Sequence, residues 1–280
     1  MASDQISQSR LNDIAELAEV VAEEHGESLR TEPEKIIDAN QITLSFGSYG
    51  EAFDGMLEHL GGRFHIYANL NRLKTPDSGR ARFTLAHELG HFYIDEHRRE
   101  LQSGRTPSHP SRTDFQSKNP VEQEADHFAS HLLMPTSRFK KAAKSLRIGL
   151  SGILTLKERF GTSITSTAIR FTKLDLGPCT LVKWNPGGFS WKWFSPSMYE
   201  AGYRSTIKTL QAVQPDSATG RALAGESPGT KQYFESGTSG SAWFPGISPG
   251  TPRDQIFIEQ AISLGEFGAL TLLYPERRML

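Results

Sequence analysis

Cysteine is nearly absent from this sequence of 280 residues, in which Cys179 is the only one. A single cysteine excludes a disulfide framework within the chain and is typical of a reducing compartment. The 31 basic and 32 acidic residues leave a net charge of −1, which gives no general electrostatic case for binding nucleic acid or a membrane surface. No apolar run approaches the roughly 18–20 residues that span a bilayer, and no signal peptide is evident. These absences predict a cytoplasmic protein without a membrane segment.

The motif His87-Glu88-Leu89-Gly90-His91 is the strongest chemical signal in the chain. Residues four apart share one face of a helix, so the imidazoles of His87 and His91 can point at one ion. Zinc binds imidazole nitrogen and lowers the pKa of a bound water to roughly 7. Glu88 is therefore the candidate base that takes a proton from that water. The motif also occurs by chance, and the alternative is an amphipathic helix whose histidines cap a core.

A second predicted helix begins near Pro120 and ends before Pro135. Glu122 and Asp126 lie four residues apart and share a face of it. A catalytic zinc site takes three protein ligands, and a ligating histidine usually donates its other N–H to a carboxylate. We therefore predict Glu122 as the third ligand and Asp126 as the partner of one histidine. Glu124 is a rival ligand on another face, and a solvated acidic cluster is the alternative.

Two further histidines and a polar segment lie near these helices. His97 follows His91 by six residues, a poor match to same-face spacing, so we expect a helix cap or a surface group. His65 lies in a predicted strand, where a structural role is more frequent than ligation. Residues 98–119 are rich in Arg, Ser and Pro, and we expect an irregular, mobile flap beside the site.

Short helices and strands precede the motif. Helical periodicity is found over residues 8–25 and 32–40, and strand patterns over 42–46 and 64–70, the latter after a Gly61-Gly62 turn. We expect these strands to form a small sheet that leads to the metal helix. An edge of such a sheet could hold an extended peptide as an added strand.

Residues 149–160 and 163–174 form two short predicted helices around Gly161, which outline a helix-turn-helix. Basic residues lie just before and within this pair. One interpretation is DNA binding through the second helix. We favour the alternative, a helical hairpin that packs against the catalytic part, because scattered positive charges do not make a base-reading surface.

The last hundred residues favour β-structure. Strands are predicted over residues 180–184, 189–194, 255–259 and 268–274. The glycine- and serine-rich stretch 237–241 lacks a strand–turn–helix context, so it is a weak signal for phosphate binding. The core is the expected place for the aromatic residues Trp184, Trp191, Trp193 and Phe194.

The two helical motifs together resemble the ImmA/IrrE family of metallopeptidases. The likeness rests on His87-Glu88-Leu89-Gly90-His91 joined to Glu122-x-x-Ala125-Asp126-x-Phe128-Ala129-x-x-Leu132-Leu133-Met134-Pro135, and it covers roughly residues 10–174. It implies a thermolysin-like metal site with His87, His91 and Glu122 as ligands and Glu88 as catalytic base. The implied ion is zinc, with manganese as the alternative.

The resemblance also implies a function. It implies a cytoplasmic endopeptidase that cleaves a helix-turn-helix repressor of the XRE type and so relieves the repression of stress-response or mobile-element genes. A zinc peptidase of broad specificity is a second hypothesis. A DNA-binding or antitoxin-like regulator with a non-catalytic metal site is a third, which the neutral charge balance disfavours. The sequence predicts neither the cleavage site nor the oligomeric state.

The expected fold is α+β with three parts. Residues 1–135 would form a zincin-like metallopeptidase domain with a small β-sheet, and residues 136–175 a helical subdomain that resembles a helix-turn-helix. Residues 176–280 would form a β-rich domain with a sensory or regulatory role, which we could not match to the sensor-like domain of the family's radiation-response branch.

Overall fold

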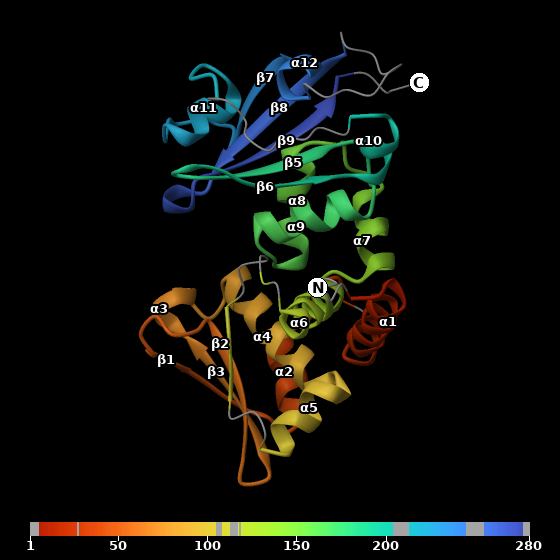
Figure 1. Cartoon of the computed structure of the whole chain (residues 1–280), viewed down its shortest axis with the longest axis vertical. Coiled ribbons are helices and arrows are strands. Elements are labelled where there is room, and N and C mark those ends of the chain that lie inside the picture. Colours follow the sequence, from red (N-terminus) through yellow and green to blue (C-terminus); the bar gives the residue numbers. More distant parts are fainter. Residues whose placement is uncertain are drawn as a thin grey trace, which may run out of the picture. The chain divides into compact units, whose positions relative to one another are not determined.

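A computed structural model describes residues 6–26, 28–104, 108–112, 117, 119–203, 213–244 and 255–276. Within these ranges the chain forms helices and two sheets, which confirms the α+β class (Figure 1). It divides into two compact units, Met1–Lys141 with Lys157–Ser163, and Ala142–Leu156 with Ile164–Leu280. The three-part division expected from the sequence stays a prediction. None of the described helices has both the length and the apolar character needed to cross a membrane.

The first unit contains the motif helix and other helices. They are α1 (Gln8–Glu24), α2 (Pro33–Ala39), α3 (Leu70–Leu73), α4 (Gly79–Tyr93), α5 (Asp95–Gln102) and α6 (Pro120–Leu133). Helix α6 packs against α4 and also against α1, so it is an inner layer of the unit. Every residue of α4 from Ala81 to His91 is buried. The HExxH motif therefore lies inside the unit.

Side chains at the helix starts explain where α4 and α6 begin. The Ser78 side chain accepts a hydrogen bond from the backbone N–H of Ala81, and the Asn119 side chain accepts one from Val121. Such bonds satisfy backbone donors that a helix leaves unpaired at its first turn. Pro120 takes the first position of α6, where its missing N–H costs nothing. The helix expected between the two prolines is thus confirmed.

The sheet of the first unit has the strand order β1-β3-β2-β4. Its strands are β1 (Thr43–Gly47), β2 (Gly55–Leu60), β3 (Arg63–Asn69) and β4 (His109–Ser111). Strand β1 is parallel to β3, and the other pairs are antiparallel. Gly61 and Gly62, with φ of +58° and +79°, form the tight β2–β3 turn. The sheet packs against α4 through β2 and β3.

Two features of this sheet differ from expectation. Strand β2 has no β-branched or aromatic residue, so propensity gave no signal for it, and its pairing with β3 across the glycine turn decides its conformation. The segment 98–119 is not irregular throughout, because α5 continues to Gln102 and β4 pairs with β2. Residues 105–107, 113–116 and 118 lie outside the described ones, and the mobility of a flap stays a prediction.

The second unit contains an antiparallel sheet of order β6-β5-β9-β8-β7. Its strands are β5 (Thr180–Asn185), β6 (Gly188–Phe194), β7 (Phe234–Ser239), β8 (Ile256–Ser263) and β9 (Ala269–Pro275). Its short helices are α10 (Pro196–Glu200), α11 (Ala218–Leu223), α12 (Gly240–Trp243) and the 3-10 turn η1 (Gly265–Phe267). The glycine-rich stretch 237–241 belongs to β7 and α12. Trp184 is buried in the core as expected, whereas Trp193 is 39% exposed.

Three helices follow α6 along the chain and precede this sheet, namely α7 (Thr136–Ala143), α8 (Leu150–Phe160) and α9 (Ile164–Lys173). The turn between α8 and α9 contains Gly161 at φ +63°, as the helix-turn-helix outline required. Helix α9 packs on β5 and β6, and its residues from Ser166 to Thr172 are buried. The helix that would read DNA bases thus covers a sheet.

Candidate metal centre

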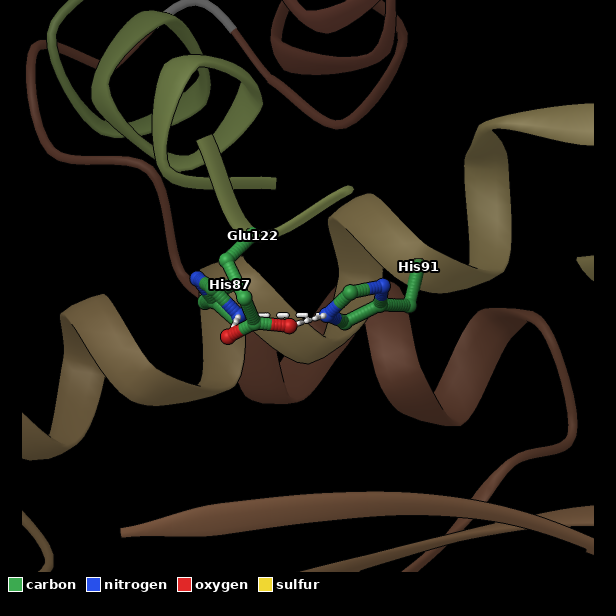
Figure 2. Close-up of side chains that lie close together, drawn as sticks. All are labelled: His87, His91 and Glu122. Carbon is green, nitrogen blue, oxygen red and sulfur yellow. Dashed lines mark hydrogen bonds and ion pairs between the residues drawn. The ribbon is translucent and has the colours of Figure 1, made fainter. Parts of the chain in front are cut away.

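Three side chains from α4 and α6 meet inside the first unit. His87 and His91 are each 1% exposed and lie one helical turn apart, with their Nε2 atoms 3.1 Å from each other. Figure 2 shows the carboxylate of Glu122 reaching from α6 to both imidazoles. Its Oε2 lies 3.4 Å from Nε2 of His87, and its Oε1 lies 3.5 Å from Nε2 of His91. Among the described residues, this triad is the group of donors placed to hold a metal ion.

The spacing of the donor atoms matches a zinc site. Ligand atoms at about 2.0–2.1 Å from a tetrahedral ion lie about 3.3–3.4 Å from one another. The three separations, 3.1, 3.4 and 3.5 Å, agree with that figure. Two imidazoles and one carboxylate are also the protein ligands of a thermolysin-type site, which keeps one position open. The residues present therefore fit a catalytic zinc ion.

Asp126 fixes the orientation of His87. Its Oδ1 lies 2.8 Å from Nδ1 of His87, on the side of the ring away from the triad. Burial lowers the pKa of His87, but hydrogen bonds to Asp126 and Glu122 outweigh burial and raise that pKa to about 10. Burial raises the pKa of Glu122, and its contacts with both histidines reverse the effect, so its carboxylate stays charged. The carboxylates of Glu122 and Asp126 thus favour a positive charge at this site, and a metal ion can supply it.

Glu88 lies next to this triad and is not one of its three donors. It is fully buried, and the Ser111 side chain and the backbone of Leu57 beside its carboxylate favour the charged form. Burial raises the pKa of Glu88 to about 8, against the opposing charge of His87. A Cβ at Gly55 on β2 would lie only 2.7 Å from its Oε1, so the glycine leaves room for this carboxylate. A buried carboxylate with a raised pKa can exchange a proton near neutral pH.

Gly90 allows the two helices to approach. A Cβ built there would lie 3.1 Å from Cα of Ala125 and 3.2 Å from its carbonyl oxygen. Any larger side chain would therefore meet the backbone of α6. The glycine within the motif and the alanine of the second helix together set the distance over which Glu122 reaches the histidines.

His97 corrects the sequence analysis. It is 8% exposed, and its Nδ1 lies 3.2 Å from Nδ1 of His91, so the expected cap or surface role is wrong. Helix α4 ends at Tyr93, and the extended residue Ile94 redirects the chain before α5 begins. Because of this break, His91 and His97 do not belong to one continuous helix, and their spacing of six residues does not place them on different faces. The sequence signal that could have found His97 is its place just after the break.

Glu124 and His65 lie elsewhere than the triad. Glu124 contacts Nε2 of His97 at 3.2 Å and forms a two-pronged pair with Arg10 of α1. His65 of β3 contacts the hydroxyl of Thr43 on the neighbouring strand, as a structural histidine would. The structure therefore brings together His87, His91 and Glu122, with Asp126 and Glu88 beside them.

Comparison with known proteins supports these motifs. A family model described as the IrrE N-terminal-like domain matches residues 69–172. No curated protein sequence matches the chain. A solved structure, a Mycobacterium tuberculosis transcriptional regulator, matches with a TM-score of 0.59 and 18% identity over 96% of this chain and 90% of that chain. At that identity the likeness concerns the fold alone.

The matched segment contains both α4 and α6 and so all residues of the triad. A match to this family supports a metallopeptidase or an IrrE-like regulator. The resemblance to the ImmA/IrrE metallopeptidases is confirmed over residues 69–172, the part of the chain that carries the candidate metal centre.

Proposed function

We propose that this protein is a zinc-dependent endopeptidase in which His87, His91 and Glu122 hold the ion. The observation that carries the proposal is the donor spacing of 3.1–3.5 Å beside a buried carboxylate, Glu88, that is not one of the ligands. A structural zinc site would use four protein ligands, whereas this triad has three donors and an adjacent base. Manganese is the alternative ion, and metal analysis of purified protein distinguishes the two.

In the proposed reaction, the three ligands would hold the ion and Glu88 would transfer the proton. The ion, when bound, would supply Lewis-acid chemistry at the scissile carbonyl. Glu88 takes a proton from the attacking water and passes it to the leaving amine. Its position suits both steps, because the carboxylate is buried beside the three donors without being one of them.

For the substrate we propose a helix-turn-helix repressor of the XRE type, cleaved at one site in the cytoplasm. The support is the family resemblance, which the model match covers at residues 69–172. The competing function, direct DNA binding through the helix-turn-helix outline, is less favoured because α9 packs on β5 and β6. With a repressor as its substrate, the protein would regulate genes by cleaving that repressor and would not need to bind DNA itself.

The test is to incubate zinc-loaded protein with a repressor encoded beside its gene. We expect a single cleavage product that a chelator prevents. Glu88→Gln should bind zinc as the wild type does and yield no product, because it keeps the ligands and removes the base. His87→Ala and Glu122→Ala should lose metal as well. Cleavage by Glu88→Gln would remove this residue from its role, and a salt-sensitive gel shift without cleavage would favour the regulator.

A further inference from the structure

A series of polar side-chain contacts leads away from His91 on the side opposite to the triad. It runs from His91 through His97 to Glu124 and ends at Arg10, so α4, α5, α6 and α1 each contribute one residue. We propose that His97 and Glu124 are positioning residues that fix the tautomer and the orientation of His91. The inference rests on the proposed function in one respect, that Nε2 of His91 is a metal ligand.

The hydrogen-bond directions follow from the acceptor at the end of the chain. Arg10 contacts both oxygens of Glu124, through Nε at 3.0 Å and Nη2 at 2.8 Å, which holds this carboxylate as an ionised acceptor. Nε2 of His97, 3.2 Å from Glu124, must then carry hydrogen and donate it. A neutral His97 is left with a lone pair on Nδ1.

That lone pair decides the state of His91. The Nδ1 atoms of His97 and His91 lie 3.2 Å apart, and two lone pairs cannot face each other at that distance. Nδ1 of His91 therefore donates, and its hydrogen leaves the lone pair on Nε2. This is the atom that faces Nε2 of His87 and the carboxylate of Glu122. Glu124 thus specifies, through one intermediate ring, the tautomer that ligation requires.

The two ligating histidines reach the same state by different routes. Asp126 accepts directly from Nδ1 of His87 at 2.8 Å. Nδ1 of His91 instead faces His97, which in turn contacts Glu124. With an ion bound, both Nε2 atoms, which lie 3.1 Å apart, would present their lone pairs to it.

The alternative is that His97 only fills space beside His91, whose ring centroid lies 5.1 Å from its own. Three variants separate the two roles. His97→Leu keeps the volume and removes the acceptor. His97→Asn places an amide oxygen near the position of Nδ1 and so restores an acceptor for His91. Asp126→Asn gives the size of the effect at the directly held histidine.

A matched control lies on α6. His131 pairs with Glu19 of α1 at 2.8 Å, and its side chain is 12% exposed, so it is a largely buried histidine–carboxylate pair on the same helix as Glu122. His131→Asn should reduce stability and leave zinc affinity unchanged. A general loss of packing would instead lower zinc affinity in this variant too.

Zinc dissociation constants are measured by competition with a chromogenic chelator. We expect His97→Leu and Asp126→Asn each to weaken zinc binding by about 10–100-fold, and His97→Asn to recover most of the loss. Affinity of His97→Leu equal to that of the wild type, or equal weakness of the Leu and Asn variants, would overturn the inference. Failure of the wild type itself to bind zinc would instead overturn the proposed function, and with it the inference.

A second measurement needs no variant. Long-range nitrogen–proton spectra of the zinc-loaded wild type report which ring nitrogen carries hydrogen. We expect His91 with hydrogen on Nδ1 and His97 with hydrogen on Nε2. The opposite tautomer of His97 would overturn the positioning role of His97 and Glu124 even if every variant failed to fold.

Discussion

Replacement of Gly90 by alanine tests whether close helix packing sets the metal site. The new Cβ would lie 3.1 Å from Cα of Ala125, 3.2 Å from its carbonyl oxygen and 3.3 Å from Cβ of Phe128. Ordinary carbon contacts begin near about 3.5 Å, so α4 and α6 must separate by a few tenths of an ångström. Two of the three neighbours are backbone atoms, which cannot rotate away.

The magnitude follows from two opposing effects. Overpacking of this kind costs about 1–3 kcal/mol, and alanine returns about 1 kcal/mol through its higher helix propensity. In the metal-free protein the helices can relax and so avoid some or all of the packing cost, and we expect a change in stability between a loss of about 2 kcal/mol and a gain of about 1 kcal/mol. The zinc-bound state requires the native spacing between Glu122 and the histidines, so it bears the part of the cost that the metal-free protein avoids. If the metal-free protein avoids the whole cost, zinc affinity is about 5–150-fold weaker.

Urea unfolding of the metal-free protein and chelator competition measure the two quantities separately. Ala125→Gly in the Gly90→Ala background should not restore affinity, since the obstructing atoms belong to the backbone. An alanine variant that is about 1 kcal/mol more stable and binds zinc normally would show that propensity alone operates. That result would refute the claim that Gly90 sets the helix spacing.

Two further predictions concern Glu88 and Glu19. Gly55→Ala places a Cβ 2.4 Å from Cγ2 of Thr84 and 2.7 Å from Oε1 of Glu88, so turnover should fall about 100-fold at unchanged zinc affinity, and equal turnover would contradict it. Burial raises the pKa of Glu19, but hydrogen bonds with His131 and Thr136 outweigh it and lower that pKa to about 2. Because the folded pKa lies below the unfolded one, this stabilisation, up to about 3 kcal/mol, is present above pH 4.5 and is lost toward pH 2. Metal-free Glu19→Gln should lack this pH dependence, and a pH-independent difference in urea unfolding would contradict the assignment.

Local chemistry explains why much of the first unit was predictable. The prolines and the cap at Asn119 determine where α6 begins, and its apolar residues recur with helical period because one face packs on α4. The spacing of His87 and His91 is a property of any helix, and the structure indeed brings Glu122 to both imidazoles. These features depend on residues that are close together in the chain, so they can be predicted from a single sequence.

The missed features depend on long-range contacts. Strand β2 has weak intrinsic preference and is specified by its partner β3 and by the Gly61-Gly62 turn. The role of His97 depends on a single extended residue, Ile94, that redirects the chain after α4. No periodicity extends through such a break. The same reasoning limits any assignment that counts residues from a motif past the end of its helix.

Helix α6 shows how one element can serve three tasks in a metal site. Glu122 faces the two imidazoles, Asp126 faces Nδ1 of His87, and Glu124 faces His97. Glu122 and Asp126 share a face of the helix and contact different nitrogens of His87, whereas Glu124 points in another direction and reaches His97. Loss of Glu122 would remove a ligand, whereas loss of Asp126 or Glu124 would release a histidine from its required tautomer. The metal centre is therefore as much a property of the packing of α6 between α1 and α4 as of the HExxH motif, which by itself fixes neither the third ligand nor the hydrogen on either ring.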